Sequence, residues 1–231
     1  PILRISDIAI DPDHPDTRYI SVGDYAYMGA GLHLDDRKRH SHFGLGVYKT
    51  TDGGMNWQPT GLSFQQTDFD FSLTRRVFVD ANDHNELLAA GTHGVWKSSD
   101  GGDNWTMVID SMISDIERDP ANPNVLYASS GYRVTLEAGT AGILKSTDFG
   151  DTWTILPSGI PGTGQAQRTE LAISSADPNY IYAIVCNLEG GLFGFYRSTN
   201  AGASWNLMSN SPNILHWSDG TGSNNGQGWY C

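Results

Sequence analysis

The sequence predicts an all-β fold made of four copies of a four-stranded antiparallel sheet, and three observations support this prediction. A ten-residue motif recurs four times, at 48–57, 96–105, 144–153 and 196–205. Two short apolar runs separated by a turn precede each copy. The composition combines 27 glycines and 11% aromatic residues with only 17% charged residues, which is typical of short strands joined by tight turns.

The motif is called the box below. Its first position is aromatic or Leu, its second Lys or Arg, its third Ser or Thr, and its fifth Asp or Asn. Its seventh position is Gly, its ninth Asn, Thr or Ser, and its tenth Trp, whereas the fourth, sixth and eighth positions vary. Successive box tryptophans are 48, 48 and 52 residues apart, so the register is nearly constant. Its third, fifth, seventh and tenth positions are Thr50, Asp52, Gly54 and Trp57; Ser98, Asp100, Gly102 and Trp105; Ser146, Asp148, Gly150 and Trp153; and Ser198, Asn200, Gly202 and Trp205.

The runs between the boxes predict the strands of each sheet. First strands are expected at "ISDIAI", "RRVFVD", "ISDIERD" and "ELAISS", and second strands at "RYISVGD", "ELLAAGTHG", "VLYASSG" and "YIYAIVC". The third strand enters the box, and the fourth is expected to open at its tryptophan. Such a unit of about 50 residues has the size of one β-propeller blade. The expected blades span 1–62, 63–110, 111–160 and 161–210, and 211–231 would begin a further blade.

The box itself is expected to form the hairpin between the third and fourth strands. Its glycines can adopt a positive φ at little cost, and its Asp or Asn can accept hydrogen bonds from turn amides and the nearby hydroxyl. The tryptophan would cover the hairpin, and burying one indole stabilises a fold by about 2–3 kcal/mol. The box is therefore interpreted as a structural element. No Gly-Lys-Ser/Thr follows it and no helix is indicated, so a phosphate-binding loop is excluded.

The pattern Ser-x-Asp-x-Gly-x-Thr-Trp resembles the Asp-box, or BNR, repeat of β-propellers. Its regular spacing is similar to that of sortilin-type propellers, xyloglucanase-like glycoside hydrolases and secreted bacterial surface proteins. The resemblance implies box carboxylates at the blade periphery, a secreted or cell-surface protein, and six or more blades. The chain is then expected to be half of a six- to eight-bladed ring, with the remaining blades in the same longer chain or in a partner chain. A closed four-bladed ring is the alternative, and Pro1 at the start suggests a processed or truncated chain.

Charge and composition exclude several classes of function. A net charge of −12 argues against binding to nucleic acids and to anionic membrane surfaces. No apolar run reaches the roughly 18 residues of a membrane span, and no signal peptide is visible. The cysteines, Cys186 and Cys231, form neither a disulfide framework nor a zinc site. Cys186 is expected to be a small buried residue on a strand, a bridge to Cys231 stays open, and no cofactor is expected.

Two carboxylates in the repeated "ISDI", Asp7 and Asp115, are the candidates for catalysis. The first strand of a blade lines the central channel, and glycoside hydrolysis uses two carboxyl groups across the scissile bond. The other interpretation is that both are polar residues facing a wet channel. The same two interpretations apply to other residues at the start of first strands: Arg75, Arg76, Arg168 and Glu170. A sialidase would need three arginines around one substrate carboxylate, and no spacing of the arginines here assembles that set.

Two insertions, at 25–44 and 132–142, are the candidate recognition loops. Tyr25, Tyr27 and Tyr132 could stack on sugar rings, and His33 and Arg37 add polar contacts. The first insertion also contains possible metal ligands, but Arg37 and its two basic neighbours would repel a cation, so no metal site is expected. The possible ligands are His33, Asp35, Asp36, His40 and His42.

These observations predict an extracellular or cell-surface binding module for polysaccharide or protein ligands. Function is argued from sites and not from the fold, and no catalytic constellation is evident. The first alternative is a fragment of a xyloglucanase-like glycoside hydrolase that uses paired channel carboxylates. A segment of a sortilin-like receptor that binds peptide in its channel is a further alternative.

Overall fold

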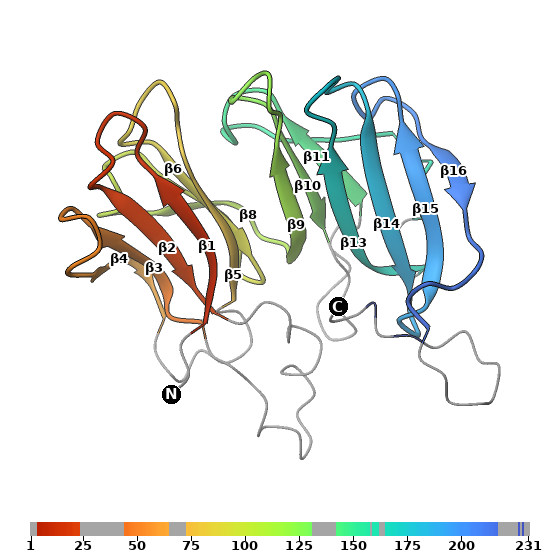
Figure 1. Ribbon diagram of the computed structural model, residues 1–231, viewed down its shortest axis with the longest axis horizontal. Helices are drawn as coiled ribbons and strands as arrows, with labels where there is room; N and C mark the ends of the chain where they lie inside the picture. The colour runs from red at the N-terminus through yellow and green to blue at the C-terminus, as the bar shows by residue number, and fades with distance from the viewer. Residues whose placement is uncertain are drawn as a thin grey trace, which may run out of the picture. The chain divides into compact units, whose positions relative to one another are not determined.

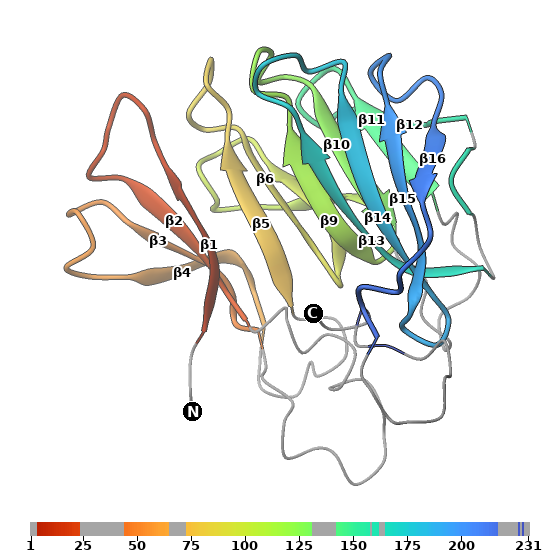
Figure 2. The ribbon, with the colours of Figure 1, turned by 45° about the vertical axis from the view of Figure 1, so that its right-hand side comes forward.

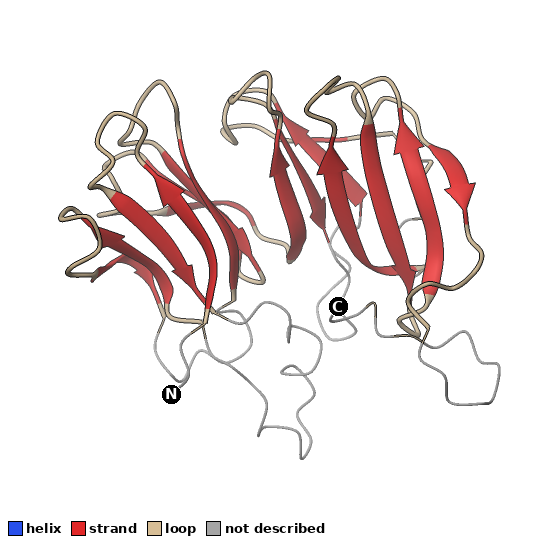
Figure 3. Cartoon of the chain, viewed as in Figure 1, coloured by secondary structure: helices blue, strands red, loops and turns tan. Residues whose placement is uncertain are grey.

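A computed structural model describes residues 4–23, 44–64, 73–130, 142–157, 159–161, 165–216, 226 and 228. Within these ranges the chain forms strands and turns and no helix (Figure 3). The first two sheets contain β1 (Ile5–Ile10), β2 (Arg18–Val22), β3 (Gly46–Thr50) and β4 (Gln58–Ser63), then β5 (Thr74–Val79), β6 (Leu87–Gly91), β7 (Gly94–Ser98) and β8 (Thr106–Ile109). The other two contain β9 (Ile113–Arg118), β10 (Leu126–Ser130), β11 (Gly142–Ser146) and β12 (Thr154–Ile155), then β13 (Ala166–Ile173), β14 (Ile181–Asn187), β15 (Leu192–Ser198) and β16 (Asn206–Ser209).

Each sheet is an antiparallel meander in which the strands pair in chain order, so the predicted all-β fold of four four-stranded blades is confirmed. One detail differs from the prediction: every fourth strand begins one residue after its box tryptophan. The indole N–H groups of Trp57 and Trp105 donate back to the carbonyl oxygens of Gly54 and Gly102, at 3.1 and 3.0 Å. This bond keeps the tryptophan within the turn.

The chain divides into two compact units, and each holds two blades. The first comprises Pro1–Asp110 with Phe149–Asp151, and the second comprises Ser111–Asp148 with Thr152–Cys231. In the first unit β1 lies beside β5, and in the second β9 lies beside β13 (Figures 1 and 2). Within each unit the first strands of its two blades are therefore neighbours, as in a propeller.

Apolar side chains from both blades form the core of each unit. In the first unit Tyr19 and Val47 of one sheet pack with Val77 and Leu87 of the other, and all four are at most 1% exposed. In the second unit Tyr127, Ile181 and Trp205 belong to one buried cluster. Sheets that pack on both faces need apolar residues on both faces, which explains the near-continuous apolar runs in the sequence.

Each box closes the turn between its third and fourth strands with its own polar groups. In the second box Ser98 Oγ donates to Asp100 Oδ1 at 2.9 Å and accepts the Gly102 N–H at 2.9 Å. The same carboxylate oxygen accepts the Asn104 N–H at 2.8 Å. The other boxes form the same hydroxyl pair, Thr50 to Asp52 at 2.7 Å, Ser146 to Asp148 at 2.7 Å and Ser198 to Asn200 at 2.9 Å.

The box carboxylates accept hydrogen bonds from groups of their own turn. Hydrogen bonds from the Asn104 backbone and side chain, and from Ser98, lower the pKa of Asp100 to about 2. The pKa of Asp52 is lowered by the equivalent bonds from Asn56 and Thr50. Glycine is required at the seventh position, where φ is 100°, 97°, 85° and 84° in boxes one to four. The fourth box forms this turn with Asn200 in place of Asp.

In each unit a box turn docks against the preceding blade. The Gly101 carbonyl oxygen of the second box accepts from Tyr19 Oη at 3.2 Å and Lys49 Nζ at 3.0 Å. In the second unit the Ala201 carbonyl oxygen of the fourth box accepts from Tyr127 Oη at 3.2 Å. The box therefore joins neighbouring blades in addition to closing its own hairpin.

We expect Ser98→Ala to lower the free energy of unfolding by about 1.5 kcal/mol, because the buried Gly102 N–H loses its acceptor. Chemical denaturation monitored by tryptophan fluorescence measures this change. The control is Ser98→Thr, which places in the second box the hydroxyl residue that the first box carries as Thr50. Equal stability of the alanine and threonine variants would contradict the assigned bond.

Cys186 is buried on β14, as the sequence predicts, and its thiol donates to the Gly228 carbonyl oxygen at 2.9 Å. Cys231 lies outside the described residues, so the bridge between the two cysteines stays an open prediction. Among the described residues, no helix has the length and apolar character needed to cross a bilayer.

Candidate functional site

The two first-strand carboxylates bond to the first strand of the neighbouring blade. Asp7 Oδ2 on β1 accepts the Val77 N–H on β5 at 3.0 Å. Asp115 Oδ2 on β9 accepts the Leu171 N–H on β13 at 2.8 Å, and Asp115 is only 1% exposed. The repeated "ISDI" thus makes the same contact in both units. The described geometry assigns both carboxylates to blade-to-blade hydrogen bonds.

Charged neighbours accompany these strands. Burial raises the pKa of Asp7, while the Val77 N–H and the Arg76 guanidinium, whose Nη1 lies 3.8 Å from Asp7 Oδ1, act to lower it. On β13, Arg168 Nε donates to Glu170 Oε1 at 2.7 Å, and the Arg168 side chain is buried. Arg76 and Arg168 therefore each lie beside an acid of their own unit.

The candidate recognition residues Tyr25, Tyr27, His33, Arg37 and Tyr132 all lie outside the described residues. Their roles in binding stay predictions.

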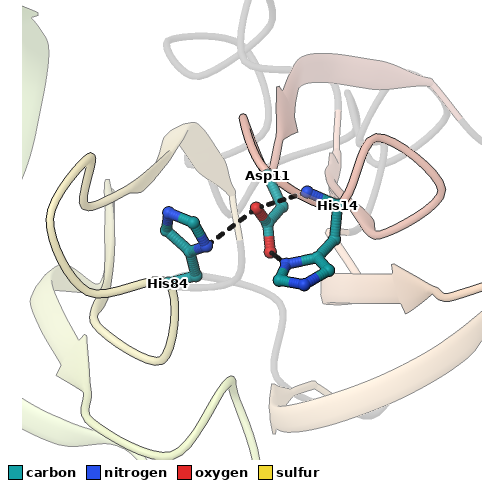
Figure 4. A group of neighbouring side chains, drawn as sticks. All are labelled: Asp11, His14 and His84. Atoms are coloured by element: carbon teal, nitrogen blue, oxygen red, sulfur yellow. Dashed lines mark hydrogen bonds and ion pairs between the residues drawn. The ribbon is translucent and has the colours of Figure 1, made fainter.

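The structure brings together a polar cluster that the sequence interpretation missed, formed by Asp11, His14 and His84 (Figure 4). Asp11 follows β1, and its Oδ1 accepts the N–H groups of Asp13 and His14, both at 3.0 Å, which forms the turn to β2. His84 lies in the corresponding turn of the next blade, between β5 and β6. Local turn chemistry therefore places His14 beside Asp11, and the packing of the two blades brings His84 to the same carboxylate.

The Asp11 carboxylate lies between the two imidazoles. His84 Nδ1 is 3.0 Å from Asp11 Oδ1, and His14 Nδ1 is 3.2 Å from Asp11 Oδ2 (Figure 4). Burial acts to raise the pKa of Asp11, but the His14 and Asp13 N–H groups, the His14 ring and the His84 charge together lower it. The Asp11 carboxylate is thus ionised at neutral pH, although its side chain is only 6% exposed.

The cluster forms part of the wall of a polar pocket of about 460 Å³ within the first unit. Among the lining residues, Lys49 Nζ lies 5.5 Å from the centre of the Tyr19 ring. Burial of Tyr19, together with the nearby charges of Asp11 and Asp103, raises its pKa to about 12. Tyr19 is therefore a neutral hydrogen-bonding group. The pocket is lined by Asp11, Asp13, His14, Thr17, Tyr19, Lys49, Thr51, Ala81, Asn82, Asp83, His84 and Asn85.

The only sequence signal for this site was a histidine in each of two equivalent turns, "DPDHPD" and "ANDHN". Those turns are 70 residues apart at His14 and His84, so the contact depends on how two blades pack and not on local spacing.

No family model and no curated protein matches the chain. Among solved structures, an ancestral GH74 enzyme matches 92% of this chain and 25% of its own, with 20% identity and a TM-score of 0.63. A GH74 enzyme of Niastella koreensis matches 90% of this chain and 30% of its own, with 20% identity and a TM-score of 0.56. The chain thus spans between a quarter and a third of these neighbours. Likeness at this identity shows the fold, which is that of β-propeller blades.

Proposed function

We propose that the chain is a binding module of a secreted or cell-surface β-propeller of the Asp-box type, and that its ligand is a polysaccharide. The observation that carries this proposal is the polar pocket of the first unit, which offers hydroxyl, amide and ammonium groups together. Groups of these kinds hydrogen-bond to the many hydroxyls of a sugar chain. The fold likeness to GH74 enzymes supports a polysaccharide over a protein ligand.

The use of the first-strand carboxylates supports binding over catalysis. A general acid or base must reach the reacting atoms of the substrate. Asp7 and Asp115 instead each accept a backbone N–H of the adjacent first strand, at 3.0 and 2.8 Å. We therefore assign no catalytic residue.

Further blades, in the same chain or in a partner chain, complete the proposed ring. Three isoleucines of β1 support this part of the proposal, because Ile5, Ile8 and Ile10 are 59%, 53% and 52% exposed. Exposed apolar rows of this kind mark surfaces that another element covers. A neighbouring blade would present the matching apolar face.

Titration calorimetry with xyloglucan oligosaccharides tests the proposed binding. We expect Asn85→Ala to weaken the affinity about three- to tenfold, because one hydrogen bond contributes about 0.5–1.5 kcal/mol. Asn85 is exposed and lines the pocket. The matched control is Asn124→Ala, since Asn124 occupies the corresponding turn position in the third blade. Equal losses from the two variants would contradict binding in this pocket.

A fragment of a xyloglucanase-like hydrolase is the second candidate, favoured by the fold likeness to the two GH74 enzymes. It predicts the release of reducing ends from xyloglucan, which Asp7→Asn or Asp115→Asn would abolish. The binding module predicts no release above the buffer blank by the wild-type chain. Release that both asparagine variants retain would exclude these carboxylates from the chemistry.

A further inference from the structure

The geometry points to a divalent transition-metal site at Asp11, His14 and His84, which would take Zn²⁺ or a similar ion and join the first two blades. This inference goes beyond the proposed polysaccharide binding and does not depend on it.

The three donor groups already lie close to one another. Zinc lies about 2.0–2.2 Å from imidazole nitrogen and carboxylate oxygen, so tetrahedral ligands are about 3.3–3.5 Å apart. His84 Nδ1 lies 3.0 Å from Asp11 Oδ1, and His14 Nδ1 lies 3.2 Å from the other carboxylate oxygen, Oδ2. All three donor atoms fall within 4.8 Å of one another. Rotation of these side chains would bring the three atoms to the separations that one ion requires.

The chemistry of the donors selects the class of ion. Two imidazoles and one carboxylate suit zinc, copper or nickel, whereas calcium and magnesium prefer oxygen ligands alone. Three protein ligands would leave a further position for water or for a ligand atom. His14 has a side chain that is 71% exposed and His84 one that is 18% exposed, so solvent reaches the site.

Neighbouring groups would hold the ligands in orientation. The Asp13 and His14 N–H groups fix the Asp11 carboxylate, both at 3.0 Å. Asp13 Oδ2 lies 3.5 Å from His84 Nε2. Once the metal takes Nδ1, Nε2 carries the proton and donates toward this carboxylate, an arrangement that raises the basicity of a metal-binding histidine.

The charges near the site favour a cation. Asp11, Asp13 and Asp83 line the pocket together with one cation, Lys49. The Lys49 ammonium donates to the Gly101 carbonyl oxygen at 3.0 Å, which holds it on the neighbouring box turn.

Titration calorimetry with ZnCl₂ and visible spectroscopy with CoCl₂ test the site on the whole chain. We expect one ion per chain, a cobalt spectrum typical of nitrogen and oxygen ligands, and a higher midpoint of chemical unfolding with zinc. His14→Ala and His84→Ala should each weaken binding by at least about tenfold. Asp13→Asn, on an exposed turn residue, tests the supporting contact without removing a ligand, and should weaken binding while leaving the midpoint of the metal-free chain unchanged.

Two controls separate this site from incidental histidine binding. His216→Ala changes an exposed histidine of the second unit and should leave binding unchanged. A combined His33→Ala, His40→Ala and His42→Ala variant should retain the ion as well. The absence of a bound ion in the wild-type chain, or binding that survives His14→Ala and His84→Ala, would overturn the inference.

Discussion

Asp115→Ala is expected to lower the free energy of unfolding by about 3 kcal/mol, because it removes a buried hydrogen-bond acceptor. The Asp115 carboxylate accepts the Leu171 N–H at 2.8 Å in a position that is 1% exposed. Without the carboxylate the N–H is buried with no acceptor and a small cavity is left beside it. Chemical denaturation, followed by fluorescence, measures the loss.

Two further variants isolate the cause. Asp115→Asn keeps an amide oxygen that can accept the Leu171 N–H, so we expect it to lose less than half as much stability as the alanine variant. Asp7→Ala removes the equivalent bond to Val77, where the Asp7 side chain is 18% exposed and water can replace part of the contact. A loss at Asp115 no greater than that at Asp7 would show that burial does not set the strength of this bond.

The strands and turns could be predicted because their causes are local. Ser98, Asp100 and Gly102 form hydrogen bonds with one another within five residues. The repeated motif alone therefore specifies the turn. The apolar runs before each box specify strands in the same local way, and the confirmed sheets follow from them.

The partners of the functional groups depend on packing between blades, which the repeat does not specify. Asp115 contacts Leu171, which is 56 residues away, and the sequence alone left open whether its carboxylate is catalytic or faces a wet channel. The contact of His14 and His84 with the same Asp11 carboxylate also depends on packing between blades, because each histidine lies in an ordinary turn of its own blade. Repetition reveals the architecture because every copy shares it, whereas sites arise where the copies differ.

His93 gives a different case, in which a turn residue is buried. It lies between β6 and β7, where its Nε2 is 2.9 Å from the Thr74 hydroxyl and its ring centre is 5.1 Å from that of Phe64. Among the described residues, no group forms a hydrogen bond with Nδ1. Burial lowers the pKa of His93 to about 3, whereas a histidine in the unfolded chain titrates near 6.5.

This difference predicts that the chain loses stability in mild acid. Between about pH 6.5 and pH 3, His93 is protonated in the unfolded chain but neutral in the folded chain. The contribution of neutral His93 to the free energy of unfolding is therefore complete above pH 6.5 and decreases as the pH falls. Within this window, each unit by which the pH falls lowers the free energy of unfolding by up to about 1.4 kcal/mol. The total loss between pH 7.5 and pH 5 is about 2 kcal/mol. Chemical denaturation at the two pH values measures the loss.

His93→Gln removes the titrating group and keeps a polar side chain of similar reach, so the variant should lose about 2 kcal/mol less than the wild type over the same pH interval. The carboxylates are common to both chains, and the difference between the two losses therefore isolates His93. The comparison does not require equal stability at pH 7.5, because only the change with pH enters it. Identical losses would mean that the folded chain protonates His93 as readily as the unfolded chain, and that the bond to the Thr74 hydroxyl does not depend on a neutral ring.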